Sequence, residues 1–528
     1  MAGKGKNAGK VTAESMAAGQ REISISEFFA KNRHLLGFDN PRRSLLTAVK
    51  EAVDNSLDAC EEADILPELF VGIKELNTDD GIFEITVRDN GPGIIKAQIP
   101  KIFGKLLYGS KFHSLKMSRG QQGIGISAAG MYGQLTTGKP VKIISRTSPR
   151  KSAHCYEIMI NTTKNKPEIL KDEPFDWDCV RGTEIKIELE GKYQKGRQSL
   201  DEYIKQTIIA NPHLTIKAEF PDGSENFSER ATTKMPEEAR AIKPHPYGVE
   251  LGVLMKMMKV TKARNISSFL SSEFSRVSIQ TAHKICSVAD LSPKANPRTL
   301  SHEKAGALHK AVKKVKIMNP PTNCISPIGE NLLVAGLKQE IEGEFFVSTT
   351  RPPAVYRGNP FIIEAAMAYG GGLKSDGLMT LFRFANRAPL QYQQSACGIT
   401  KAILSIDWKK YGLQQSRGAL PSGPVVIMVH IASVWVPFTS ESKEAIAHYP
   451  DITKELRLAL QECGRKMSTF IRKKRRHAEE QSRRTYIQKY LPHVITGLRH
   501  IGTIQEKEED KYMEKLITIL ERTRAQNA

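Results

Sequence analysis

The sequence predicts an α+β protein made of several domains. Its 528 residues exceed what one hydrophobic core usually holds. Segments with strand and with helix periodicity alternate between residues 71 and 220, and only helical segments follow them, to residue 318. Strand patterns then return around a single helix. These observations divide the chain into residues 1–22, a disordered tail; 23–238, an α/β sandwich; 239–318, a small all-helical domain; 319–490, a second α/β domain that ends in a long helix; and 491–528, a short helical end.

The composition favours a negatively charged partner. The chain carries 78 Lys and Arg residues against 57 Asp and Glu residues, which gives a net charge of +21. This excess indicates nucleic acid first and an anionic membrane surface second, with an unpartnered basic protein as the alternative. The seven cysteines include no C-x-x-C pair, which argues for a reducing interior rather than a zinc or disulfide framework. Because the N-terminus also lacks an apolar run of signal-peptide length, we expect a cytoplasmic protein.

The N-terminal residues change from a tail to helices. Residues 1–22 are rich in Gly, Ala and Lys without periodicity, as disordered segments are. A short helix is expected between residues 23 and 38, with Ser26 as a candidate cap. An amphipathic helix follows from Leu45 to Cys60. Its apolar stripe is formed by Leu46, Val49, Val53 and Leu57, and its polar side by Glu51, Asn55 and Asp58.

The next strand ends in a carboxylate. Alternation from Ile82 puts Phe83, Ile85 and Val87 on one face, and Asp89 follows on that same face. A buried carboxylate without a donor is costly. Either the strand has already ended in the turn Asn90-Gly91-Pro92-Gly93, or Asp89 accepts a hydrogen bond from a bound group such as an adenine amino group.

A glycine-rich run offers a place for phosphates. Gly120, Gly123 and Gly125 give the pattern G-x-x-G-x-G, and a helical segment starts directly after it. Backbone N–H groups at such a turn can line up on an anion. The run matches neither of the common phosphate-binding patterns, G-x-x-x-x-G-K-[ST] and G-x-G-x-x-G, so by itself it is weak evidence.

The rest of the chain supplies further elements. The sandwich should contain strands at 71–75, 82–88, 141–146, 154–160, 182–189 and 214–219. The all-helical domain should contain helices at 247–260, 265–274, 278–288 and 300–316, and the second α/β domain strands at 344–350, 360–368, 379–385 and 424–436 with a helix at 395–405. Asp176 and Asp178 follow no convincing strand, so we expect a loop there rather than a Mg²⁺ site. The segment from Pro437 to Glu444 is typical of a helix start, and the long helix from Ile452 should end at Pro492.

Taken in order, three of these pieces resemble a known family. E-x-x-x-N on a helix, D-x-G-x-G after a strand and a Gly-rich lid resemble the ATP-binding fold shared by gyrase, heat-shock chaperones, histidine kinases and mismatch-repair ATPases. The surrounding VKEAVDNSLDA, RDNGPGI and SRGQQGIGISAAGMYGQ are most similar to the B subunit of DNA topoisomerase VI. The four helices after residue 240 resemble a helix-two-turns-helix domain, and the strands after 320 resemble a transducer domain. The resemblance covers residues 23 to 490.

The resemblance implies an ATP-hydrolysing topoisomerase subunit with ATP and Mg²⁺ as cofactors. Glu51 would activate the attacking water and Asn55 would hold Mg²⁺. Asp89 would recognise adenine, and Lys443 would reach back from the transducer to the γ-phosphate. The implied nucleotide contacts are Asn55, Asp58, Asp89, Gly93, Ser110, Lys111, Gly120, Gln121, Gln122, Gly123, Ile124, Gly125, Ile126, Ser127, Thr183 and Lys443.

It also implies DNA contacts and partners. Trp408, Lys409 and Tyr411 match a DNA-contacting W-K-x-Y motif, and Lys195 and Arg197 partly match a family loop that carries two more arginines. The implied partners are an A-type subunit with a catalytic tyrosine, a second copy of this chain that ATP closes into an A2B2 assembly, and double-stranded DNA, but no membrane. Two alternatives remain at this point. One is a mismatch-repair-like or chaperone-like ATPase, and the other is a nucleotide-regulated DNA-binding protein without turnover.

Overall fold

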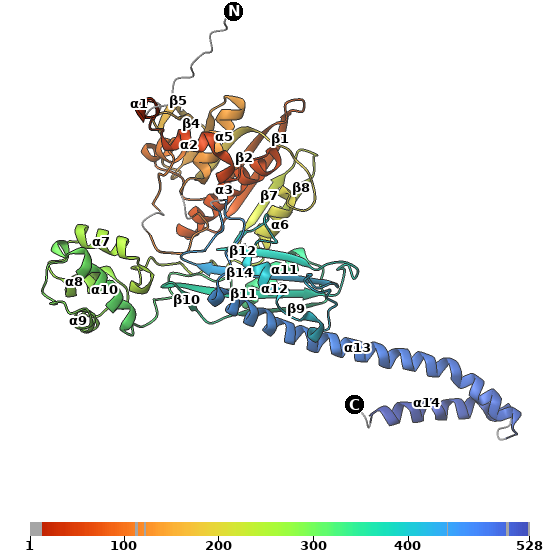
Figure 1. The fold of residues 1–528 in the computed structure, drawn as a ribbon. Coiled ribbons are helices and arrows are strands. Elements are labelled where there is room, and N and C mark those ends of the chain that lie inside the picture. The colour runs from red at the N-terminus through yellow and green to blue at the C-terminus, as the bar shows by residue number, and fades with distance from the viewer. Residues whose placement is uncertain are drawn as a thin grey trace, which may run out of the picture. The chain divides into compact units, whose positions relative to one another are not determined.

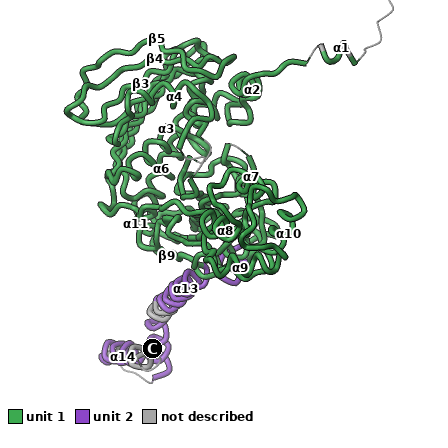
Figure 2. The backbone as a smooth tube through the Cα atoms, turned by 90° about the vertical axis from the view of Figure 1, so that its left-hand side faces the viewer, with its two compact units in different colours: residues 1–406, 415–463 green, residues 407–414, 464–528 purple. Residues whose placement is uncertain are grey.

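The computed structural model describes residues 13–18, 20–110, 114–120, 123–440, 442–502 and 506–525. The chain forms two compact units (Figure 2). The first consists of residues 1–406 and 415–463, and the second of residues 407–414 and 464–528.

The N-terminal sandwich is built on a β-sheet that packs against helices (Figure 1). This sheet has eight strands in the order β5-β4-β3-β6-β2-β1-β7-β8. Its strands are β1 (Glu68–Asn77), β2 (Ile82–Asp89), β3 (Val141–Arg146), β4 (Ala153–Asn161), β5 (Lys166–Phe175), β6 (Gly182–Glu190), β7 (Thr215–Glu219) and β8 (Glu225–Ser228). The six strands predicted from the sequence are confirmed. The sequence interpretation missed β5 and β8 because they are edge strands whose side chains are largely exposed, and therefore show no apolar alternation. Strand β5 leads directly into Asp176, which corrects the expectation that no strand precedes it, although residues 176–178 are irregular as expected.

Helices α3 (Pro41–Glu62), α4 (Ile99–Gly104), α5 (Gly125–Thr137) and α6 (Leu200–Ala210) share one core with this sheet. Helix α3 begins where the Asn40 side chain accepts a hydrogen bond from the Arg43 N–H and Pro41 occupies the first turn. Its predicted apolar stripe, including Val49 and Val53, is fully buried. The alternation of β2 also holds through Asp89, which is buried on the same face as Val87.

The N-terminal segment requires one correction. Helix α2 (Ile25–Lys31) is capped by Ser24, whose hydroxyl accepts a hydrogen bond from the Glu27 N–H at 3.1 Å, and not by Ser26. Ser26 lies inside the helix, is buried, and donates a hydrogen bond to Asn165 Oδ1. Upstream, helix α1 (Ala13–Ala18) lies within the predicted tail, whose residues 1–12 and 19 are outside the described part of the chain, so the disorder stays a prediction.

The all-helical domain has the four helices that the sequence predicts. They are α7 (Leu251–Val260), α8 (Ile266–Glu273), α9 (Ile279–Val288) and α10 (His302–Lys314). Phe269, Ile285 and Leu308 are fully buried in a core of their own. Its helices α8 and α10 are capped by Asn265 and Ser301, which the sequence places directly before the apolar pattern.

The second α/β domain contains a six-stranded sheet with the order β10-β11-β14-β12-β13, and β9 pairs with β11. Its elements are α11 (Glu330–Glu340), β9 (Phe345–Thr350), β10 (Ala354–Tyr356), β11 (Asn359–Tyr369), β12 (Thr380–Ala385), β13 (Ala388–Pro389), α12 (Gly398–Leu404) and β14 (Val425–Ser433). The four predicted strands and the helix are confirmed. Helix α11 and the short strands β10 and β13 were missed, although Leu333 and Leu337, one turn apart and buried, carried a helical signal.

Helix α13 (Pro450–His500) does not end where the sequence interpretation ended it. Pro492 lies inside the helix. A proline removes one backbone hydrogen bond, but the residues on both sides still make theirs, and the Thr496 hydroxyl donates a hydrogen bond to the Pro492 carbonyl at 2.9 Å. Helix α14 (Glu509–Ala525) follows in the second compact unit. No helix among the described residues is both long and apolar enough to cross a membrane.

Candidate active site

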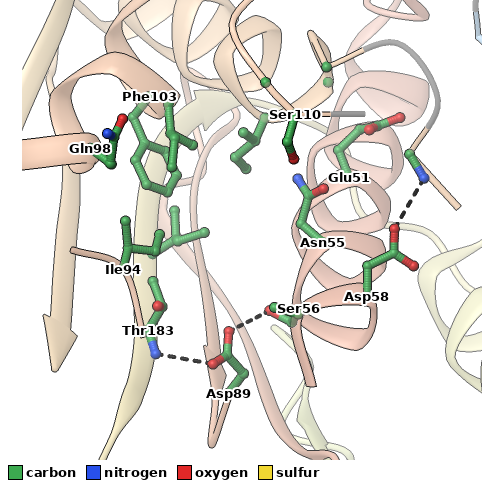
Figure 3. A pocket seen from close by; sticks show the side chains of 18 of the residues that line it. Glu51, Asn55, Ser56, Asp58, Asp89, Ile94, Gln98, Phe103, Ser110 and Thr183 are labelled. Carbon is green, nitrogen blue, oxygen red and sulfur yellow. Dashed lines mark hydrogen bonds between the residues drawn. The ribbon is translucent and has the colours of Figure 1, made fainter. Parts of the chain in front are cut away.

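A cavity of about 620 Å³ opens in the first unit beside α3, the end of β2 and the start of α5 (Figure 3). Its size is that of a small-molecule or nucleotide site. Twelve predicted residues line it: Glu51, Asn55, Asp58, Asp89, Gly93, Ser110, Gly120, Gly123, Gly125, Ile126, Thr183 and Lys443. Ile124 and Ser127 are buried behind this lining, and the Ser127 hydroxyl donates to the Ile102 carbonyl. The predicted contacts Lys111, Gln121 and Gln122 lie outside the described residues.

Helix α3 presents its polar side to the cavity. Glu51, Asn55 and Asp58 fall on this side because they are separated by four and by three residues, which is about one helical turn. In Figure 3 they follow one another along the helix, with Ser56 nearest the end of the cavity that Asp89 occupies. The helix therefore fixes the spacing of these three polar side chains along the cavity.

Asp89 lies at one end of the cavity with three donors around it. Its Oδ1 accepts hydrogen bonds from the backbone N–H groups of Gly91 at 2.9 Å and Thr183 at 3.1 Å, and its Oδ2 accepts one from the Ser56 hydroxyl at 2.8 Å. Burial raises the pKa of Asp89, and these three hydrogen bonds oppose that rise. A carboxylate has about four acceptor positions, so one position on Oδ2 is left for a ligand.

Two glycines allow this end of the site to close tightly. Gly182 has a φ of +133°, and a Cβ there would lie 2.0 Å from the Asp89 carbonyl oxygen. Gly93 has a φ of +69°, and a Cβ there would lie 2.2 Å from the Arg146 carbonyl oxygen. Both positions are therefore restricted to glycine by backbone conformation and by space.

The glycine-rich run ends at the N-terminus of α5. The cap residue of this helix, Ile124, provides no side-chain acceptor, so the first N–H groups and the positive end of the helix dipole are suited to an anion. A Cβ on Gly125 would lie 1.8 Å from Glu51 Oε2, which places the Glu51 carboxylate directly beside the helix start. Just upstream, the Gly120 N–H points at Asp58 Oδ2 at 3.4 Å. The predicted phosphate position is thus next to the predicted catalytic carboxylate.

Lys443 enters this site from the second α/β domain. Its Nζ lies 3.5 Å from Glu51 Oε1, and its side chain is 7% exposed. The expectation that Pro437–Glu444 starts a helix is wrong, because α13 begins only at Pro450 and the Thr439 N–H is bonded to the Ala445 carbonyl. This bond closes a loop in which Lys443 adopts a φ of +53°. The loop, rather than a helix, brings the lysine to the cavity.

Sequence reasoning missed several members of the site. Ser56, which directly follows Asn55, orients Asp89, and the apolar side chains of Ile94, Ile102 and Phe103 form one wall. The hydroxyl that directly follows Asn55 in the sequence was a signal that could have identified Ser56. The wall residues carried no signal, because only the fold brings the segment after β2 over the cavity.

The residues expected to contact DNA occur in both units. In the first, Lys195 is exposed and forms a 2.5 Å ion pair with Asp222, and Arg197 is exposed. In the second, Trp408 is fully buried and Tyr411 is half-buried, whereas Lys409 is exposed. The Trp408 ring is thus not available for stacking on a base, and the W-K-x-Y segment can offer its lysine side chain instead. Within the described residues, no cluster of three or more His, Cys, Asp or Glu side chains could hold a metal ion.

Comparison with known proteins first defines the class. A family model described as "Histidine kinase-, DNA gyrase B-, and HSP90-like ATPase" matches residues 43–182, which contain α3, β2 and the glycine-rich run. A second, "Topoisomerase VI B subunit, transducer", matches residues 320–483. The first α/β domain is therefore an ATPase domain of this class, and the second is a transducer.

The relatives then give the family. The B subunit of type 2 DNA topoisomerase 6 from Methanosarcina mazei is 50% identical over 93% of this chain and 79% of its own length. Those from Methanococcoides burtonii and Archaeoglobus fulgidus are 51% and 46% identical, over 92% and 96% of this chain and 78% and 83% of their own lengths. The chain belongs to this family, and it is an ATP-hydrolysing subunit of a type II DNA topoisomerase. Among solved structures, the match to the ATPase region of Saccharomyces cerevisiae topoisomerase II covers 87% of this chain and 99% of that one, at 10% identity and a TM-score of 0.39.

Proposed function

We propose that the cavity binds Mg·ATP with its base at Asp89 and its phosphates at the start of α5, and that Glu51 activates the attacking water. The observation that carries this proposal is the placement of Asp89 and Glu51 at opposite ends of one cavity, with Lys443 from the transducer beside Glu51. The free acceptor position of Asp89 suits the amino group of adenine. The start of α5 beside Glu51, which no side chain caps, suits the phosphate chain.

Three polar residues of the cavity then have proposed roles. Asn55, between Asp58 and Glu51 on α3, would hold Mg²⁺ through its amide oxygen, a ligand type that this ion accepts. Mg²⁺ would supply neutralisation of the phosphate charge. Glu51 would accept a proton from water, and Lys443, which carries a positive charge at the same point, would contact the γ-phosphate and so distinguish ATP from ADP. Gly93, Ser110, Thr183 and the run Gly120–Ser127 complete the proposed nucleotide contacts.

The quaternary arrangement belongs to this proposal as well. Membership of the B-subunit family implies an A-type partner and DNA, and we propose an A2B2 assembly in which ATP closes two copies of this chain around a duplex while the partner cuts another. DNA contacts are assigned to Lys409, Tyr411, Lys195 and Arg197, with Trp408 fixing the backbone next to Lys409. The cytoplasm is the proposed location, since all seven cysteines are free, as suits a reducing compartment. The domain limits 23–238, 239–318 and 319–490 are kept as proposed.

Replacing Glu51 tests the catalytic assignment. Glu51→Ala should lower the rate of ATP hydrolysis by roughly 10² to 10⁴, the usual contribution of a general base. Binding of ATP, followed by calorimetry, should persist because Asp89 and the helix start are unchanged. The matched control is Glu75→Ala, which removes an exposed carboxylate of β1 outside the cavity. Hydrolysis by Glu51→Ala at the rate of the unaltered protein would refute the assignment.

A further inference from the structure

Arg43 of α3 holds the residues on either side of Lys443. Its Nη2 lies 2.5 Å from Glu444 Oε1 and donates a hydrogen bond to the Ser442 hydroxyl at 3.1 Å. Its Nη1 forms a second ion pair with Asp39 Oδ1 at 2.6 Å. Arg43 lies eight residues before Glu51 on the same rigid helix, so the side chain that holds the loop and the carboxylate that meets Lys443 are fixed to one element.

Backbone hydrogen bonds close the base of the loop, whereas side-chain contacts hold its tip. At the base, the Thr439 N–H donates to the Ala445 carbonyl at 2.9 Å, and the Ala447 N–H donates to the Pro437 carbonyl at 2.8 Å. The tip carries Lys443 in the left-handed region, with a φ of +53°, a conformation that a non-glycine residue keeps only when its surroundings impose it. Contacts with α3 on both sides of Lys443 provide such surroundings.

The Arg43–Glu444 pair is shielded from water. The two side chains are 14% and 7% exposed. Burial raises the pKa of Glu444, and Arg43 is the strongest of the groups that oppose this rise. Glu444 Oε2 is buried and has no hydrogen-bond partner within the described residues. The ion pair between Arg43 and Oε1 therefore offsets much of the free-energy cost of burying this carboxylate. Without Arg43, the Glu444 carboxyl would either take up a proton or move towards water, and both changes would remove the ion pair that holds the residue next to Lys443 on α3.

The aromatic ring of Tyr392 closes the other side of the arginine. The Arg43 guanidinium lies 5.5 Å from the centre of this ring, and Tyr392 belongs to the transducer segment after β13. A cation over a ring face is attracted by it. The ATPase helix is thus joined to the transducer at three points, Tyr392, Ser442 and Glu444, all through one side chain.

From these contacts we infer that Arg43 is a positioning residue, which docks residues 442–444 of the loop through Glu444 and Ser442 and thereby sets Lys443 at the nucleotide cavity. The inference rests on the proposed role of Lys443 and adds the device that places it. Arg43 acts through the loop and does not itself line the cavity.

The test compares turnover with nucleotide binding in the full-length chain, without DNA. Arg43→Ala and Glu444→Gln should each lower kcat for ATP hydrolysis roughly tenfold, the size expected for contacting groups that act as a unit. Binding of ADP, measured by calorimetry, should stay within about twofold, because ADP lacks the phosphate that Lys443 meets. Arg42→Ala is the matched control. Arg42 is the neighbouring arginine on α3, and it donates to the Arg197 carbonyl instead of to the loop.

Two further variants separate positioning from simple loss of structure. Adding Arg43→Ala to Lys443→Ala should cause little further loss of kcat, since Arg43 then has no lysine left to position. Arg43→Lys, which keeps the positive charge between Asp39 and Glu444, should retain part of the activity that Arg43→Ala removes. An unchanged kcat in both Arg43→Ala and Glu444→Gln, with Lys443→Ala strongly impaired, would overturn the inference and leave the proposed function intact. An unimpaired Lys443→Ala would instead overturn the proposed role of Lys443, and the inference with it.

Discussion

Asp89 keeps one acceptor position open, and we propose that this position reads the base of the nucleotide. Its other positions are taken by Ser56, Gly91 and Thr183, so the carboxylate is oriented before any ligand arrives. A preoriented acceptor loses little conformational freedom on binding. In the proposed role it would also reject a purine that presents an acceptor at the same point, because two acceptors facing each other in a buried site would both be unsatisfied.

Replacing this carboxylate gives a prediction at the scale of one residue. Asp89→Asn should lose a charge-assisted hydrogen bond worth about 1.5 to 3 kcal/mol, and so weaken ATP binding roughly ten- to a hundredfold. Calorimetry with ATP and with GTP measures this. Ser56→Ala, which leaves the charge but removes one orienting donor, should show a smaller loss. Equal binding of ATP and GTP by the unaltered protein would contradict the reading of the base by Asp89.

At the scale of elements, the turn between β12 and β13 links the transducer sheet with the ATPase domain. Arg387, at a φ of +66° in this turn, forms an ion pair with Glu61 of α3 at 3.2 Å, and Glu61 also pairs with Arg119 beside the glycine-rich run at 2.6 Å. Burial alone would raise the pKa of Glu61, but Arg119 and Arg387 hold it well below its usual range. The backbone N–H of Arg387 donates to His430 Nε2 at 3.0 Å, so this nitrogen carries no proton, and His430 Nδ1 faces Glu364 at 2.7 Å.

The buried imidazole of His430 should make the stability of the transducer depend on pH. Burial lowers the pKa of His430 below its ordinary value of 6.5, although Glu364 opposes this. The unfolded chain therefore binds a proton at a higher pH than the folded one, and the free energy of unfolding should fall as the pH drops below about 6.5. Thermal unfolding between pH 8 and pH 5 measures the effect. His430→Gln, which cannot be protonated, should show a shallower decline, and an identical pH dependence in both proteins would contradict this origin.

The short helix η6 (Trp408–Tyr411) gives a second prediction at this scale. Trp408 is buried and Lys409 is exposed, so Lys409→Ala should weaken binding to duplex DNA. The loss of one phosphate contact should also make the slope of log affinity against log salt concentration shallower by about 1. Trp408→Phe should preserve that salt dependence, since the ring does not reach the nucleic acid. Fluorescence anisotropy over a series of salt concentrations measures both. A greater loss of affinity in Trp408→Phe than in Lys409→Ala would favour base stacking instead.

At the scale of the whole molecule, the chain should control DNA cleavage without performing it. Cleavage of the topoisomerase kind needs a tyrosine beside carboxylates that bind Mg²⁺, and no metal-binding cluster of three or more His, Cys, Asp or Glu side chains occurs in the described residues. We expect the isolated chain to hydrolyse ATP and to leave supercoiled plasmid intact. Addition of the A-type subunit should give ATP-dependent relaxation, measured by gel electrophoresis, that Lys443→Ala suppresses. A covalent tyrosine adduct formed by this chain alone would disprove the division of labour.

The sequence by itself determined those parts of the protein that depend on local periodicity. The stripe of α3, the alternation of β2 up to Asp89 and the four helices of the central domain follow from side-chain spacing along one element, and spacing is fully present in the chain. The resemblance to the family was carried by the same short segments. For this reason Glu51, Asn55, Asp89 and Gly125 were assigned to one site before the fold was known.

The tertiary structure alone decided what depends on residues distant in sequence. The resemblance places Lys443 at the phosphates although it lies 392 positions after Glu51, but no periodic pattern marks its loop or its left-handed backbone, which the fold alone shows. The Arg43–Glu444 pair and the Arg387 turn are likewise contacts between domains. The continuation of α13 through Pro492 was decided by the balance between one lost hydrogen bond and many retained ones. Local patterns fix which face of an element is buried, but only the packing of whole elements fixes which buried faces meet.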